Sequence, residues 1–143
     1  NLDRQRCVDA LTALGDEKAD EMLDLSVQRG TLMDLEEGKI SPSDFFKRMR
    51  QKIGKAVSDE EIVHALNELL IGIPLDRLTL LRKLRQRFNV MMLSNTNPIM
   101  FDTKIAECFA QEGLSITDYF DDVYLSYRLK SCKPDIAIFK KGI

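Results

Sequence analysis

The sequence has 143 residues, of which 44% are hydrophobic and 31% are charged, and its formal net charge is −2. This composition is typical of a soluble globular chain and excludes a disordered one. Because there is no basic excess, nucleic acid and anionic membrane surfaces are not expected partners.

The chain opens with two predicted helices. Asp3 can cap the first of them, and Gly15 can end it. Asp16 is then expected to open a second helix, because apolar side chains follow it at helical spacing. They are Ala19, Met22, Leu23 and Val27.

Two further helices begin at strong capping signals. Ser41 is followed by a proline at the first helical position and by an acid three residues on, and Ser58 also has an acid three residues on. An apolar stripe follows each of these signals. His64 lies inside the second of these helices, and we assign it no catalytic or metal-binding role.

Gly72-Ile73-Pro74 separates two kinds of pattern. Before it, from about residue 16, only helices are predicted, and after it helices alternate with short strands, which indicates a parallel sheet with right-handed crossovers. The expected elements are a helix from Leu75, a strand Val90–Leu93, a helix from Pro98, a strand Val123–Ser126 and a helix opened by Lys133-Pro134-Asp135. We therefore predict an α/β core, residues 1–15 and 73–143, with a helical subdomain inserted at 16–72.

Small polar residues follow the first predicted strand, which reads as buried and covered on both faces. Ser94 stands at the strand end, Asn95, Thr96 and Asn97 come next, and Pro98 suits a first helical turn. In an open α/β sheet ligands bind at this carboxyl edge, and backbone N–H groups near a helix N-terminus favour an anion. The alternative is ordinary helix capping by the same residues.

Lys133 follows the second predicted strand and precedes Pro134, beside an expected helix N-terminus. The helix dipole repels a cation there, so a lysine at this position indicates a nearby anion or an acid that it neutralises. The alternative is an exposed surface lysine.

The three cysteines, Cys7, Cys108 and Cys132, are widely spaced and form no C-x-x-C pair. A disulfide framework and a structural zinc site are therefore not indicated, and buried reduced thiols in a cytoplasmic protein are expected. No apolar run is long enough to span a bilayer.

Together, Leu93-Ser94-Asn95-Thr96-Asn97 and Lys133-Pro134-Asp135 resemble motifs of the haloacid dehalogenase (HAD) superfamily, and most closely its phosphatase-like branch with a small helical cap. The resemblance implies a Rossmann-like parallel core with an inserted cap that selects the substrate. It further implies that Ser94 binds the transferred phosphoryl group, that Asn95 contributes a backbone N–H, and that Lys133 neutralises charge.

The resemblance also implies Mg²⁺ as cofactor, an aspartyl-phosphate intermediate and a small phosphorylated metabolite as substrate. The family's nucleophilic aspartate and its later acidic pair, which holds the metal, are not found in this sequence. Asp3 follows no apolar run and is not assigned as the nucleophile, and we assign no metal ligand. We expect these 143 residues to be part of a longer chain and not to hydrolyse phosphate esters by themselves.

Two alternatives remain open at this stage. A carbon–halogen hydrolase of the same superfamily shares the Ser and the Lys but needs no metal. A helical interaction module without enzymatic activity would use the Leu and Phe stripes to bind a partner, with the turn at Ser94 serving only as a helix cap.

Overall fold

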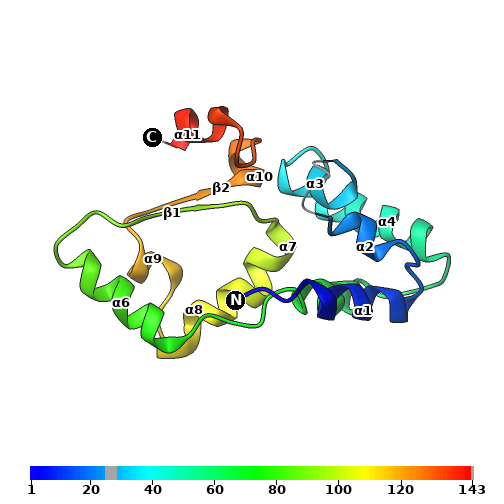
Figure 1. The fold of residues 1–143 in the computed structure, drawn as a ribbon, viewed down its shortest axis with the longest axis horizontal. Coiled ribbons are helices and arrows are strands. Elements are labelled where there is room, and N and C mark those ends of the chain that lie inside the picture. Colours follow the sequence, from blue (N-terminus) through cyan, green and yellow to red (C-terminus); the bar gives the residue numbers. More distant parts are fainter. Residues whose placement is uncertain (25–28, 143) are drawn as a thin grey trace.

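The computed structural model describes residues 1–24 and 29–142, so the predicted apolar position Val27 lies outside the described residues. Up to Asn67 the described elements are all helices (Figure 1). They are α1 (Arg4–Leu14), α2 (Ala19–Met22), α3 (Thr31–Glu36), α4 (Pro42–Ile53) and α5 (Asp59–Asn67).

The predicted capping signals are confirmed where α4 and α5 begin. The backbone N–H of Asp44 donates to the Ser41 hydroxyl at 3.1 Å, and the N–H of Glu61 donates to the Ser58 hydroxyl at the same distance. Each acid returns a bond to the backbone N–H of its serine, so two otherwise unsatisfied donors are paired at each helix start.

The predicted helix start at Asp16 is wrong. The Asp16 carboxylate is almost fully buried, accepts a hydrogen bond from the Lys18 N–H at 3.1 Å and lies 3.1 Å from the Lys52 ammonium. It therefore forms a turn and an ion pair with α4, and α2 begins only at Ala19.

Helices α1 to α5 share one apolar core, and α7 (Pro98–Met100) of the second half also contributes to it. Cys7 and Leu11 of α1 lie in it, and Ile99 and Met100 extend it into the α/β half of the chain. Its members are Cys7, Leu11, Ala19, Leu23, Leu32, Leu35, Phe45, Met49, Ile53, Ile62, Ala65, Leu66, Ile99 and Met100. The division into a core of 1–15 and 73–143 and a cap of 16–72 stays a prediction.

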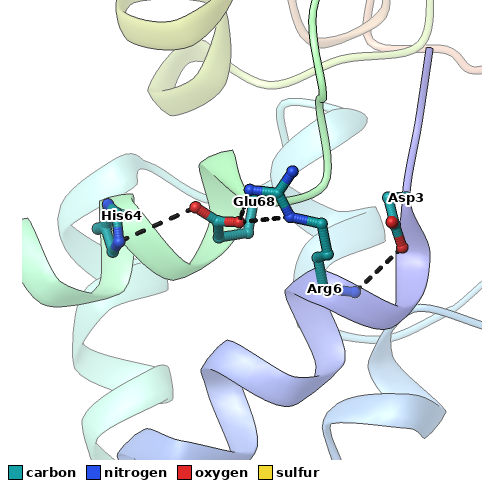
Figure 2. Close-up of polar contacts among 4 residues, drawn as sticks. All are labelled: Asp3, Arg6, His64 and Glu68. Atoms are coloured by element: carbon teal, nitrogen blue, oxygen red, sulfur yellow. Dashed lines mark hydrogen bonds and ion pairs between the residues drawn. The ribbon is translucent and has the colours of Figure 1, made fainter.

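Polar contacts also hold α1 against α5, as Figure 2 shows. Asp3 caps α1 through the backbone N–H of Arg6 at 3.1 Å, and the Arg6 Nε donates to the Glu68 carboxylate at 2.8 Å. His64 lies 3.9 Å from the same carboxylate, with 80% of its side chain exposed. The beginning of the chain is thereby fixed beside the end of α5, where Asp3 N–H also donates to the Leu69 carbonyl at 2.8 Å.

The second half combines helices with a small sheet. Figure 1 shows α6 and α9 on one side of the two strands and α11 on the other. Besides α7, its elements are α6 (Leu75–Arg85), β1 (Met91–Ser94), a π-helical turn η1 (Phe101–Ile105), α8 (Ala106–Phe109), a 3₁₀ turn η2 (Ala110–Glu112), α9 (Ile116–Tyr119), β2 (Asp122–Leu125), α10 (Ser126–Leu129) and α11 (Ile136–Gly142).

The two strands pair in parallel, with Ser94 opposite Leu125, and this confirms the predicted α/β architecture with a parallel sheet. The first strand lies one residue later than predicted, because Val90 bonds to Asp121 and not to a residue of β2. The Asp121 carboxylate accepts from the Val90 N–H at 2.8 Å, and the Asp121 N–H donates to the Val90 carbonyl at 2.7 Å. In the part of the chain that the structure describes, β1 has no strand on its other edge.

The interpretation of the first strand as buried on both faces is only partly right. Met91 is 51% exposed, whereas Met92 packs against a second apolar core below the sheet. That core consists of Leu78, Phe109, Tyr119 and Phe120, from α6, α8, α9 and the residue that follows α9.

The helix predicted at Pro98 is confirmed as the continuous run α7, η1 and α8, but the last helix does not begin at Pro134. Lys133 and Pro134 lie in a turn, and the Asp135 carboxylate accepts from the Ala137 N–H at 2.8 Å at the start of α11. Among the described residues no helix has both the length and the apolar character needed to cross a membrane.

Candidate functional site

Ser94 ends β1 at the carboxyl edge of the sheet, as the sequence predicts. Its side chain is half-buried, and within residues 1–24 and 29–142 its hydroxyl makes one long contact, 3.4 Å to the Asn95 carbonyl. A bond of this length is weak, so the hydroxyl retains its capacity to bind a ligand oxygen.

Asn95 joins the two predicted motifs directly. Its side-chain N–H donates to the Lys133 carbonyl at 3.0 Å, and its side-chain oxygen accepts from the Lys133 N–H at 2.8 Å. These two bonds fix the backbone of Lys133 against the strand end 38 residues earlier.

The Lys133 ammonium lies at the same edge, where it donates to the Leu93 carbonyl at 3.1 Å. The residue is exposed, and an ammonium has three donors, so further donors remain for an anion. The structure thus places all three predicted site residues, Ser94, Asn95 and Lys133, at or beside the end of β1.

Ser126 supports the site in a way that the sequence analysis missed. Its buried hydroxyl accepts from the Thr96 N–H at 3.0 Å and donates to the Thr96 carbonyl at 2.9 Å, which holds the loop after β1 against the start of α10. The available signal was its position, because Ser126 comes directly after the apolar residues of β2, as Ser94 comes directly after those of β1. We predicted it as the last strand residue, but it opens α10.

A cavity of about 260 Å³ lies beside these groups. Asn95 and Lys133 line it on one side, and helices α2 and α3 and the start of the chain contribute most of the other walls. Its lining residues are Leu2, Arg4, Met22, Leu23, Asp24, Arg29, Leu32, Met33, Glu36, Leu69, Asn95 and Lys133. Ser94 lies beside the cavity without being one of them.

Two ionisable groups near the cavity have shifted pKa values. Burial raises the pKa of Glu36 from 4.5 to about 7, so this carboxyl is partly protonated near neutral pH. Burial also raises the pKa of Cys132 to about 11, and the carboxylates of Glu36 and Glu37 add to that effect. The Cys132 thiol, next to Lys133, is therefore no thiolate nucleophile at neutral pH. The three cysteines are free and buried, as predicted.

The described residues do not form a Mg²⁺ site. They contain no group of three or more His, Cys, Asp or Glu side chains placed to hold a metal. The groups that meet at the strand ends are a hydroxyl, an amide and an ammonium, and they suit the oxygens of an anion better than a hard cation, which prefers carboxylate ligands.

A parallel sheet with a hydroxyl, an amide and an ammonium gathered beside a cavity is an arrangement that α/β proteins use to bind small anionic ligands. Comparison with known proteins makes the class specific. No family model matches the sequence. A D-ribitol-5-phosphate phosphatase from Bacteroides thetaiotaomicron is 36% identical over 139 residues, which cover 97% of this chain and 68% of the relative.

Solved structures agree with this relative. A HAD family enzyme from B. thetaiotaomicron, in complex with magnesium and inorganic phosphate, superposes with a TM-score of 0.90 at 38% identity, covering 98% of this chain and 69% of that chain. A predicted HAD-like hydrolase from Porphyromonas gingivalis gives a TM-score of 0.89 at 30% identity, over 98% and 67%. The chain belongs to the haloacid dehalogenase superfamily, in its phosphatase-like branch.

Family membership confirms the resemblance stated from the two motifs, and with it the fold class. The alternative interpretations, a carbon–halogen hydrolase and a helical interaction module, gain no support from these relatives. The magnesium expected from the resemblance is present in the B. thetaiotaomicron enzyme, both as wild type and as a variant in which an aspartate is replaced by alanine, each with phosphate bound.

Proposed function

We propose that the protein carrying this chain is a Mg²⁺-dependent phosphatase of small phosphorylated metabolites, in which Ser94, Asn95 and Lys133 bind the phosphoryl group. The pair of hydrogen bonds between Asn95 and Lys133 carries the proposal, because it joins one residue of each motif at one edge of the cavity. The 36% identical phosphatase and the phosphate-bound HAD enzyme supply the reaction class.

Each residue has a distinct part in this proposal. The Ser94 hydroxyl donates to one oxygen of the phosphoryl group. The Lys133 ammonium places positive charge beside the oxygens on which negative charge accumulates in the transition state. Asn95 presents its backbone N–H to the same group, while its side chain holds Lys133 in position.

When bound, magnesium supplies charge neutralisation at the phosphoryl group. The described residues provide no metal cluster, so no step of the proposal passes through the ion. This chain's own contribution is to bind and orient the phosphoryl group and to enclose the remainder of the substrate in the cavity.

Steady-state hydrolysis of small phosphate monoesters by the whole protein that carries this chain, measured as released phosphate with Mg²⁺ present, tests the proposal. We expect Ser94→Ala and Lys133→Ala each to lower kcat/KM by about a hundredfold, because removing one preorganised donor from a developing anion costs about 3 kcal/mol.

Lys140→Ala, an exposed lysine of α11 that does not line the cavity, is the matched control and is expected to retain wild-type kinetics. Phosphate release that does not depend on Ser94 or on Lys133 would overturn the site assignment. A wild-type protein that releases no phosphate from any monoester would overturn the function.

A further inference from the structure

The acidic residues of α3 differ in how they are paired. Asp34 forms an ion pair with Arg48 at 2.9 Å, and the residue after the helix, Glu37, pairs with Lys39. Glu36 lies between them, is half-buried, and receives no hydrogen bond or ion pair from any other residue in the described ranges. A carboxyl withdrawn from water without a partner is costly, and a ligand group that bonds to it would offset that cost.

Glu36 lines the same cavity as Asn95 and Lys133. It comes from a helix of the predicted cap, whereas Asn95 comes from the loop after β1 and Lys133 from the turn between α10 and α11. A phosphate monoester whose phosphoryl group lies at Asn95 and Lys133 therefore extends its alcohol part into a space that Glu36 also lines. Leu32, Met33 and Leu69 line the same cavity and offer no polar group there other than backbone.

We propose that Glu36 is a specificity residue that binds hydroxyl groups on the alcohol part of the substrate, so that phosphate monoesters of polyhydroxylated alcohols are preferred. This inference rests on the proposed phosphatase function. A hydroxyl both donates and accepts, and so does a carboxyl that is partly protonated near neutral pH, whereas a second anionic group on the substrate would be repelled by the charged form.

The cavity volume of about 260 Å³ agrees with a small substrate rather than a macromolecule. Its charged lining residues are divided between both signs, with Arg4, Arg29 and Lys133 against Asp24 and Glu36. Arg4 is already used within the protein, because its Nε donates to the Leu23 carbonyl at 2.9 Å. Of the two acids of α3, Glu36 lines the cavity and Asp34 does not, so Glu36 is the one that is placed to contact a ligand.

Two phosphate esters with the same five-carbon chain test the inference: D-ribitol 5-phosphate, which carries hydroxyls along the chain, and n-pentyl phosphate, which carries none. We expect the wild-type protein to favour the polyol ester in kcat/KM. Glu36→Ala is expected to reduce the ratio of the two kcat/KM values about tenfold or more, since a site built to bind a hydroxyl discriminates strongly against its absence.

Glu36→Gln keeps one donor and one acceptor and is expected to recover part of the ratio, which a purely structural role would not predict. Asp34→Asn, in the same helix but outside the cavity, is the matched control and is expected to leave the ratio unchanged. Thermal unfolding of each variant verifies that it is folded.

An unchanged ratio in both Glu36 variants would overturn the inference, and so would equal losses on both esters. A wild-type protein that hydrolyses both esters without preference would overturn it while leaving the phosphatase function in place. A wild-type protein that hydrolyses neither ester nor any other monoester would overturn both proposals.

Discussion

The side-chain amide of Asn95 connects the two motifs that we propose to bind phosphate, beside the contact of the Lys133 ammonium with the Leu93 carbonyl. Its donor and its acceptor are both used on the backbone of Lys133, at 3.0 and 2.8 Å. The Lys133 ammonium therefore depends on Asn95 for its position, although the two residues lie far apart in the sequence.

We expect Asn95→Ala to lower kcat/KM for a phosphate monoester by about tenfold to a hundredfold, because a small misplacement of a charged group weakens the stabilisation of the transition state. Asn95→Asp keeps the acceptor for the Lys133 N–H but loses the donor and adds a negative charge beside the bound phosphate, so we expect a larger loss. Steady-state kinetics measure both variants.

Asn67→Ala is the control for this prediction, since it removes a half-buried asparagine that donates to the Thr103 hydroxyl at 3.0 Å and does not line the cavity. Wild-type kcat/KM in Asn95→Ala would show that Lys133 is positioned without the amide.

Motif spacing predicts Ser94, Asn95 and Lys133 as the candidate site residues, and the structure places Asn95 and Lys133 in contact beside the end of β1. Motif spacing was not sufficient to predict what the Asn95 side chain does, because its partner is 38 residues away and the contact exists only once β1 and β2 have paired. The support from Ser126 was missed for the same reason: its hydroxyl bonds a loop 30 residues earlier.

At the scale of elements, the starts of α4 and α5 were predicted correctly because a capping box is satisfied within four residues. The predicted helix starts at Asp16 and Pro134 were wrong, because a contact with another residue decides where each helix begins. Asp16 binds Lys52 of another helix, and Asp135 rather than Pro134 bonds the first turn of α11.

Gly38 marks the closest approach between the end of α3 and α10. It has a φ of +65°, and a Cβ atom added to it would lie 2.3 Å from the Tyr127 carbonyl oxygen. We expect Gly38→Ala to lower the free energy of unfolding by more than the roughly 1–3 kcal/mol that a strained positive φ costs alone, because a backbone atom must also move. Urea unfolding measures this change.

Gly54→Ala separates the two contributions, since Gly54 has a φ of +69° and a Cβ atom added to it would meet no atom within 4 Å. The free energy lost in Gly38→Ala beyond that lost in Gly54→Ala reports the contact with Tyr127. Equal losses would mean that α10 yields to the added methyl group without cost.

At the scale of the whole molecule, the apolar core explains why the cavity is bordered by elements from both ends of the chain. Residues of α1, of α2 to α5 and of α7 share one cluster, so the helices of the first half are packed against α7, the helix that follows β1, rather than linked to it by loops alone. Helical periodicity predicted which residues would be buried within each helix, but not that α1 and α7 would join the same core, because periodicity carries no information on which faces meet.

The burial of Glu36 in this arrangement makes stability depend on pH. Its pKa is raised from 4.5 to about 7 in the folded protein, so between these values the folded state binds more protons than the unfolded state. Stability contributed by the protonated form is therefore present below about pH 4.5 and is lost as pH rises to about 7, by up to about 3 kcal/mol for such a shift. The charged neighbours lining the cavity are Arg4, Asp24, Arg29 and Lys133.

Glu36→Gln removes this titration, and we expect the variant to gain stability relative to the wild type as pH rises from 5 to 8. Urea unfolding at pH 5, 6, 7 and 8 measures the difference, in which the titration of groups common to both proteins cancels. Glu17→Gln, an exposed carboxyl, is the control and is expected to give a curve parallel to the wild type. A parallel curve for Glu36→Gln as well would mean that Glu36 titrates in the folded protein as it does in water, and that burial in the cavity wall does not perturb it.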